Sequence, residues 1–149
     1  MSGRSAPTGR EPAQKADPLA ERSTILLAPG EGRSYDMPNM RAVFKTDGAE
    51  TGDRYCVSEW WVKPGGNGPG AHMHEANDEV FYGIAGTMSV LADDVWHDLT
   101  PGGFIRVPAG VVHDFRNRTS ESAAVLNVFI PGGFERHMPA IVKWFVENG

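Results

Sequence analysis

Short runs of strand-forming residues recur through most of this 149-residue chain, and they limit the folds open to it. Residues 55–62 and 123–130 are the longest of these runs, and both are rich in the β-branched and aromatic residues that strands favour. The sequence is punctuated by 18 glycines and 11 prolines, residue types that favour turns. Many short strands separated by turns are typical of a β-sandwich or barrel, so we predict an all-β fold.

The expected strands follow one another at short intervals, and Asp93 and Asp94 form an expected hairpin turn between two of them. The predicted strands lie at residues 23–28, 40–45, 55–62, 80–84, 87–91, 95–99, 104–107, 113–117 and 123–130.

A short helix is expected near the C-terminus, at residues 138–147, with Pro139 in its first turn. Four apolar residues fall on one face of this helix at spacings of three and four: Met138, Ile141, Val142 and Phe145. This face either packs on the outside of the barrel or against a second subunit, or it forms a lid over a pocket.

The length of the chain suits one domain. Residues 1–22 are small, polar, charged and interrupted by proline, with almost no large apolar group to bury. We interpret them as a disordered N-terminal tail or, alternatively, as a strap that pairs with a neighbouring subunit. Residues 23–149 then form the single folded domain.

Composition argues against several classes of partner. The net charge of −5 and the 22% of charged residues provide no basic stripe for nucleic acid. No apolar run is long enough to span a membrane. Cys56 is the only cysteine, which excludes an internal disulfide and is compatible with a reducing compartment. We therefore predict a cytoplasmic protein.

One group of residues is suited to bind a metal ion: His72, His74, Glu79 and, later in the chain, His113. Alternate residues of a strand point to the same face, so His72 and His74 are expected side by side. Residues 75–78 have turn composition, which would bring Glu79 back beside them across a hairpin. Three imidazoles and one carboxylate suit one divalent ion of iron, manganese, nickel, cobalt, copper or zinc, and leave coordination positions open for chemistry.

The spacing of these residues resembles the two sequence motifs of the cupin superfamily, with residues 66–86 as the first motif and residues 102–117 as the second. The resemblance extends to small single-domain bacterial cupins of the quercetinase-like group, and it implies a double-stranded β-helix that binds one metal ion. The metal ligands implied by it are His72, His74, Glu79 and His113. Its turn glycines and structural positions fall on Gly66, Gly86, Gly102, Gly110, Pro108 and Asn117.

Strand alternation also predicts the walls of a pocket beside the metal. Phe81 and Gly83 are expected on the metal's side of one strand, and Phe115 and Asn117 on the same side of another. Gly83 would leave space for a ligand, and Arg106 is a further residue within reach of one. An aromatic pocket suits a planar organic substrate, although Phe81 and Phe115 suit a plain hydrophobic core equally well.

Three functions are compatible with such a site. The first is a metal-dependent dioxygenase for a planar aromatic or enolisable substrate, in which Glu79 takes the substrate's proton. The second keeps the metal as a Lewis acid in a polyketide-type cyclase, an isomerase or a lyase. The third is a small-molecule binding module without catalysis. We favour an enzyme.

A homodimer is also expected. Small cupins are typically dimers by resemblance, and the adjacent Trp60 and Trp61 point to opposite faces of a strand. One indole therefore faces outward, and its apolar surface is a candidate for cover by a second subunit.

Overall fold

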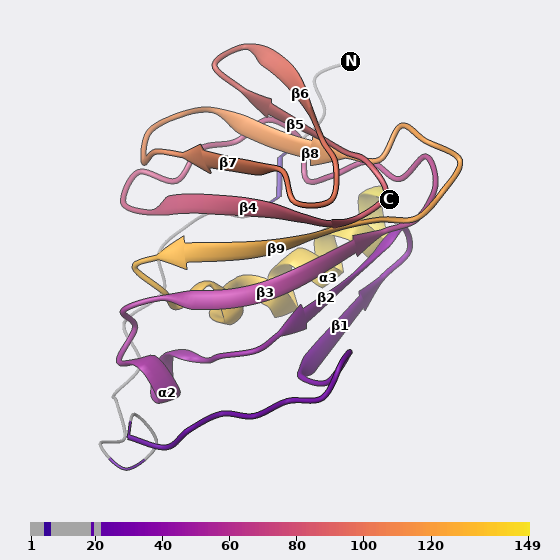
Figure 1. Ribbon diagram of the computed structural model, residues 1–149. Helices are drawn as coiled ribbons and strands as arrows, with labels where there is room; N and C mark the ends of the chain where they lie inside the picture. The colour runs from indigo at the N-terminus through magenta and orange to yellow at the C-terminus, as the bar shows by residue number, and fades with distance from the viewer. Residues whose placement is uncertain (1–4, 7–18, 20–21) are drawn as a thin grey trace.

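The computed structural model of the protein describes residues 5–6, 19 and 22–149, and these residues form two antiparallel sheets and a C-terminal helix (Figure 1). The strands are β1 (Arg33–Met37), β2 (Met40–Phe44), β3 (Cys56–Val62), β4 (Asp78–Ala85), β5 (Met88–Ala92), β6 (Val95–Leu99), β7 (Phe104–Val107), β8 (His113–Arg116) and β9 (Ala123–Ile130). The helices are α2 (Gly48–Thr51), the 3-10 helix η1 (Phe134–His137) and α3 (Met138–Asn148). The predicted all-β fold with a short C-terminal helix is confirmed.

The strands are distributed over a six-stranded sheet, in the order β1-β2-β3-β9-β4-β7, and a three-stranded sheet, in the order β6-β5-β8. Strand β9, late in the chain, returns to the middle of the larger sheet between β3 and β4. Alternation along β3 and β9 sends every second side chain inward, so that Trp60, Val125 and Phe129 are buried. The hydrophobic core and the functional site both lie on this inner face.

Most of the predicted strands are found within a residue or two of their expected ends, and Asp93 and Asp94 form the turn between β5 and β6 with positive φ angles. The prediction of a strand at residues 23–28 is wrong. These residues adopt no strand, and the side chain of Leu26 is 90% exposed. A β-prone sequence becomes a strand only where a neighbouring strand offers its hydrogen bonds and an apolar surface.

Strand β1 and helix α2 were not anticipated from the sequence. The composition of β1 is polar, and its pairing with β2 rather than its own residues makes it a strand. Helix α2 is a single turn that begins after Asp47. The Asp47 side chain accepts a hydrogen bond from the backbone N–H of Glu50, and the Glu50 side chain accepts one from the backbone N–H of Asp47. Elements this short, which form only through contacts with neighbouring elements, leave little hydrophobic periodicity in the sequence.

Helix α3 lies behind the six-stranded sheet in Figure 1, and β1 is the strand with which it has the most extensive contact. Met138, Ile141 and Phe145 are buried and Val142 is half-buried, as the predicted apolar face requires. The helix therefore packs on the inner side of the sheet, where Ile141 and Phe145 reach the space between the two sheets. None of the helices in the described part of the chain is long and apolar enough to cross a membrane.

The predicted N-terminal tail, residues 1–22, falls largely outside the described residues. Ala6 is described, and it is buried against the loop before the first histidines, where its N–H donates a hydrogen bond to the Pro69 carbonyl (3.0 Å). The hydroxyl of Ser5 donates a hydrogen bond to the Ala71 carbonyl (2.5 Å). This short stretch of the N-terminal segment thus lies beside the candidate site.

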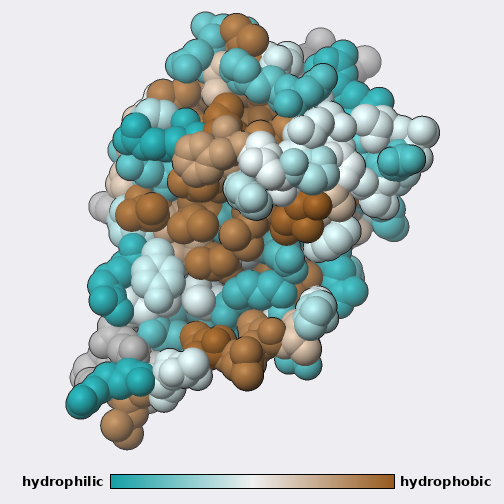
Figure 2. Space-filling model, in the orientation of Figure 1, coloured by the Kyte–Doolittle hydropathy of each residue, from teal (hydrophilic) through white to brown (hydrophobic). Residues whose placement is uncertain are grey.

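The outer face of the six-stranded sheet carries several exposed apolar side chains. Trp60 is buried and Trp61 is 39% exposed, so the two indoles do point to opposite faces. Tyr82 on β4 and Phe104 on β7 are register partners and are exposed beside each other on this outer face. Figure 2, in the orientation of Figure 1, shows hydrophobic side chains gathered over the middle of the molecule on this side.

Candidate metal centre

His72 and His113 are held together by their backbones. The N–H of His72 donates to the His113 carbonyl (2.9 Å), and the N–H of His113 donates to the His72 carbonyl (2.7 Å), which forms an isolated bridge beside β8. Each ring is oriented through Nδ1, which contacts the Gly70 carbonyl at 2.7 Å in His72 and the Val111 carbonyl at 2.9 Å in His113. Because a carbonyl only accepts, Nδ1 carries the proton in both rings, and Nε2 is left with a free lone pair.

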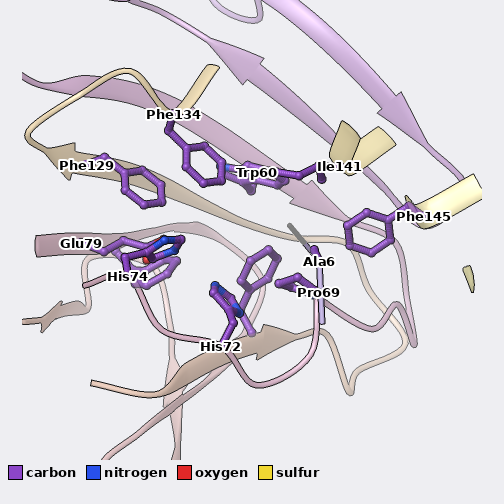
Figure 3. A pocket seen from close by; sticks show the side chains of 12 residues that line it. Ala6, Trp60, Pro69, His72, His74, Glu79, Phe129, Phe134, Ile141 and Phe145 are labelled. Atoms are coloured by element: carbon purple, nitrogen blue, oxygen red, sulfur yellow. The ribbon is translucent and has the colours of Figure 1, made fainter. Parts of the chain in front are cut away.

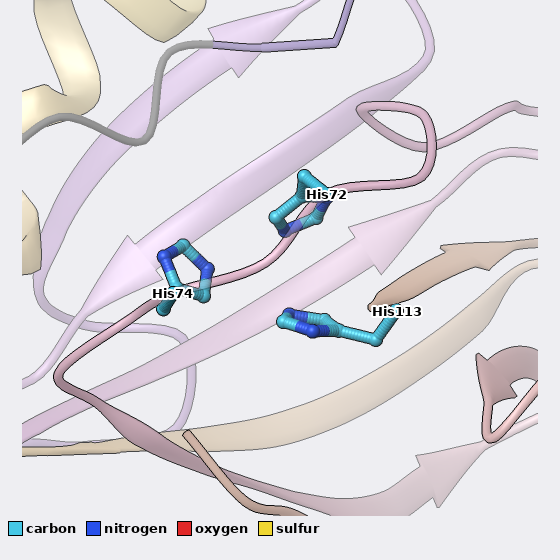
Figure 4. A group of neighbouring side chains, drawn as sticks. All are labelled: His72, His74 and His113. Atoms are coloured by element: carbon cyan, nitrogen blue, oxygen red, sulfur yellow. The ribbon is translucent and has the colours of Figure 1, made fainter. Parts of the chain in front are cut away.

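His74 approaches the other two histidines from an extended loop. Its carbonyl accepts a hydrogen bond from Gly110 (2.9 Å), and its ring stands edge-on to Phe129 at 5.1 Å and to Phe134 at 5.8 Å between centroids. Figure 4 shows the three imidazoles turned towards a common space. One ring nitrogen from each of them lies within 4.8 Å of the others, so the three histidines can bind a single metal ion.

Glu79 reaches the same space from β4. Its Oε2 lies 2.6 Å from Nε2 of His113 and 3.6 Å from Nε2 of His74. Its Oε1 accepts a hydrogen bond from Nδ2 of Asn127 (2.9 Å). Only 4% of Glu79 is exposed, so this carboxylate is buried.

The donor atoms of the site fit a metal ion. Three of them, Nε2 of His74, Nε2 of His113 and Oε2 of Glu79, are buried and have no hydrogen-bond partner of good geometry among the described residues. Buried polar atoms normally have such partners, and a cation would satisfy all three at once. Imidazole nitrogens with one carboxylate oxygen and no thiolate suit a divalent transition metal rather than a structural zinc knot.

The pKa values of all four candidate ligands are shifted by burial and by their contacts with one another. Burial lowers the pKa of His74 to about 4, and it also lowers the pKa of His72, so both rings are neutral. Burial opposes charge on Glu79 and His113 as well, but their contact with each other outweighs it. The pKa of Glu79 is lowered and that of His113 is raised. Their contact is one that either a shared proton or a shared cation stabilises.

The structure corrects how these residues come together. The predicted strand through His72 and His74 and the hairpin to Glu79 are wrong, because residues 71–77 form a loop with one isolated bridge. Glu79 pairs instead with Val107 of β7 and Phe129 of β9. The loop is nevertheless extended, so His72 and His74 still point towards one space.

Three of the candidate metal ligands, His72, His74 and Glu79, line a cavity between the two sheets, and its empty space, with the part open to solvent, is about 440 Å³. Phe81 and Phe115 are part of its wall, on the side that strand alternation predicts. Figure 3 shows rings from several elements turned towards it, and Ile141 and Phe145 reach it from α3. The lining residues are Ala6, Trp60, Pro69, His72, His74, Glu79, Phe81, Phe115, Phe129, Phe134, Ile141 and Phe145.

Three residues predicted for the pocket lie elsewhere. A Cβ on Gly83 would come within 2.1 Å of the Thr100 carbonyl oxygen. The glycine therefore lets the backbone at Thr100 approach closely, and no space for a ligand remains there. The side chain of Arg106 is exposed on the outer side of β7 and forms an ion pair with Asp78 (3.4 Å). Strand alternation gives the wrong position for Asn117, because β8 ends at Arg116.

Asn117 instead joins two loops. Its Nδ2 donates to the carbonyls of Val62 (3.1 Å) and Glu121 (2.6 Å), and its Oδ1 accepts hydrogen bonds from the N–H (2.9 Å) and hydroxyl (2.7 Å) of Thr119. This agrees with the structural position that the motif resemblance implies for it, and not with a place in the pocket.

Several residues of the site were missed in the sequence. Phe129 and Phe134, whose rings stack at 4.1 Å with an interplanar angle of 7°, form the wall behind His74. Phe134 lies in η1, which no pattern predicted. Asn127, which contacts Glu79, had a detectable signal, because it is the one polar residue within the apolar run of β9.

Comparison with known proteins agrees with this architecture. A family model described as a cupin domain matches residues 58–129. Quercetin 2,3-dioxygenase of Bacillus subtilis (strain 168) is 39% identical over 64 residues, which make up 43% of this chain and 19% of that protein. The match thus spans about a fifth of the length of that curated relative.

Solved structures give the same result for the fold. KdgF from Halomonas sp. superposes with a TM-score of 0.64 at 18% identity, over 73% of this chain and 94% of that one. The polyketide cyclase RemF from Streptomyces resistomycificus superposes with a TM-score of 0.63 at 21% identity, over 72% and 80% of the two chains. The fold of the chain is that of these solved structures, and residues 58–129 match the cupin-domain model.

Proposed function

We propose that the protein is a metal-dependent enzyme that acts on a planar, uncharged or weakly acidic organic molecule, and that it is a dioxygenase. The observation that carries the proposal is the position of the candidate metal centre. His74, His113 and Glu79 present buried atoms without a hydrogen-bond partner among the described residues, and His72, His74 and Glu79 line a cavity whose other walls are almost entirely apolar. A ligand in that cavity touches the centre from one side and aromatic rings from the others.

The walls of the cavity define the substrate class. None of the described residues that line it is a lysine or an arginine, and five phenylalanines and one tryptophan are among them. A phosphate or a sugar acid would find no cationic partner there, and burying its charge would be costly. Aromatic rings stack on planar molecules, so a flavonol-like or catechol-like compound suits the walls better.

A divalent metal ion bound at the centre would supply positive charge and an open coordination position for an oxygen atom of the substrate. The chain itself does the rest. Phe129 and Phe134 hold His74 and limit water, while the walls of the cavity orient the ring system of the substrate. Glu79 is the one carboxylate among the described residues that line the cavity, and it is the base that would accept the substrate's hydroxyl proton.

Support for oxygen chemistry comes from the stretch that is 39% identical to quercetin 2,3-dioxygenase. The test is oxygen consumption by the protein loaded in turn with Fe(II), Mn(II), Ni(II) and Co(II), with flavonols and catechols as substrates. We expect substrate-dependent oxygen uptake that is lost in Glu79→Gln. Product formation that continues under argon would replace the dioxygenase by a cyclase, isomerase or lyase. Binding of the compounds without any product would leave a binding module.

We also propose that two copies of the chain associate through the outer face of the six-stranded sheet. This face exposes Trp61 and Tyr82, and charged side chains on it are paired within the chain, as in Lys45 with Glu59 (3.0 Å) and Arg41 with Asp36 (3.5 Å). It therefore offers little to a charged partner, whereas a second flat apolar sheet face matches it. Residues 23–28, with a β-prone sequence but no strand partner within the described chain, border the same side and are available to the second copy.

Trp61→Glu is expected to convert the protein from dimer to monomer, because it replaces an exposed apolar side chain of this face with a charged one. Molar mass from light scattering is the measurement, and metal content should be unchanged. Val146→Glu is the matched control, since Val146 is 65% exposed on α3, away from this face. A monomeric mass for the wild-type protein, or a dimeric mass for Trp61→Glu, would contradict the proposal.

A further inference from the structure

A single polar side chain interrupts the inner face of β9. The inward positions of this strand are Ala123, Val125, Asn127 and Phe129, and all four are buried. Asn127 is only 1% exposed. Its Cα register partner on β4 is Phe81, two residues along from Glu79, so the amide lies diagonally across from the carboxylate.

The orientation of this amide is determined by its neighbours. Nδ2 of Asn127 lies 2.9 Å from Oε1 of Glu79 and 3.3 Å from the carbonyl oxygen of Val80. Both neighbours are acceptors, so the NH2 group and not the carbonyl of the amide must face them. Asn127 is not among the residues that line the cavity, and it contacts Oε1 of Glu79, whereas His74 and His113 approach Oε2.

We propose that Asn127 is a positioning residue that makes Glu79 a one-oxygen ligand. With Oε1 held by Asn127, only Oε2 points to the space shared by His74 and His113. A carboxylate free to rotate could offer both oxygens to an ion and occupy two coordination positions. The amide thus keeps one more position open for substrate, and it fixes the carboxylate before any ion arrives.

Packing alone does not explain an asparagine at this point. Oδ1 of Asn127 has no hydrogen-bond partner among the described residues, and burial of an unsatisfied polar atom destabilises a fold. An aliphatic side chain of similar size would fill the same space beside Val125 and Phe129 without that cost. What the aliphatic side chain would lack is the N–H group that Glu79 uses.

The inference rests on the proposed metal centre, and it is tested with the metal rather than with turnover. Asn127→Leu keeps the size of the side chain and removes its donor. Ser58→Ala is the matched control, because Ser58 is the buried Cα partner of Asn127 on β3, and its hydroxyl contacts Trp60 (3.0 Å) and not Glu79. The affinity of each protein for Co(II) is measured by competition with a chelator, together with the visible absorption of bound Co(II) and the melting temperature of the metal-free protein.

Asn127→Leu is expected to bind Co(II) about 10- to 100-fold more weakly than the wild type and to change its visible spectrum, since a supporting hydrogen bond to a ligand has that order of effect. Ser58→Ala should keep both the affinity and the spectrum. If Asn127→Leu does not fold, Asn127→Ala is judged by the same comparison. Wild-type affinity and spectrum in the Asn127 variant, or an equal loss in Ser58→Ala, would overturn the inference. Failure of the wild-type protein to bind Co(II) at all would instead remove the metal centre itself.

Discussion

His113→Ala is expected to abolish stoichiometric metal binding, with a loss of affinity of more than about 100-fold. His113 contributes one of the three clustered ring nitrogens, and its Nε2 is the closest partner of Glu79 Oε2 at 2.6 Å. Its removal leaves two imidazoles and a carboxylate that no longer has its nearest partner. The metal content of protein reconstituted with excess ion and then desalted, measured by inductively coupled plasma spectrometry, gives the result.

His97→Ala is the matched control for this variant. His97 is an exposed imidazole on β6, so the same atoms are removed from the chain but none is removed from the metal centre. The control should retain the wild-type metal content. Equal metal contents in His113→Ala and the wild type would show that the ion is bound elsewhere, and a parallel loss in both variants would point to histidine-dependent surface binding.

Phe44→Ala is expected to lower the free energy of unfolding by about 3–5 kcal/mol, the usual cost of removing a buried phenyl ring. Phe44 is fully buried on β2, and its ring packs edge-on against Tyr35 at 5.5 Å and Trp60 at 6.3 Å. These contacts join the outer strands of the six-stranded sheet to the wall of the cavity. A loss of this size is a large part of the stability of an ordinary domain.

Urea unfolding followed by tryptophan fluorescence measures the effect, and Phe44→Leu provides the comparison. Leucine fills most of the same space, so its cost should stay below about 1.5 kcal/mol. If Phe44→Ala and Phe44→Leu destabilise the protein equally, or if neither does, the contacts of the Phe44 ring do not hold the outer strands to the cavity wall.

The elements that could be predicted from the sequence are those with a strong local pattern. Strand β9, with its long apolar run, and helix α3, with apolar residues at helical spacing, were both expected at nearly their observed positions. Residues 23–28 carry as strong a β signal and form no strand. A strand forms only where another strand pairs with it, and the local sequence does not show which strand that will be.

The candidate metal ligands, too, could be predicted from the sequence only in part. His72, His74, Glu79 and His113 were recognised from residue type and spacing, but the route that brings Glu79 to the histidines was wrong. The expected hairpin would have brought Glu79 to the histidines through residues close in sequence. In the structure, β4 is instead positioned by its pairing with β7 and β9, which lie further along the chain.

The pocket was predicted less well than its ligands, because alternation was extended past the end of a regular strand. It placed Phe81 and Phe115 correctly, since both lie within strands, but it failed at Asn117, one residue after β8 ends. At Gly83 the inward direction was right and the neighbour was unforeseen, because the Thr100 carbonyl already occupies that space. Walls supplied by η1 and α3 depend on tertiary packing, which no single-strand rule describes.

The most direct test of the metal centre is the position of the ion itself. Crystals of the cobalt-loaded protein, with anomalous diffraction data collected at the cobalt absorption edge, locate it independently of any activity. We expect one anomalous peak surrounded by His72, His74 and His113 and facing Oε2 of Glu79. A peak held by other residues, or cobalt-loaded crystals without a peak beside these four side chains, would contradict the proposed metal centre.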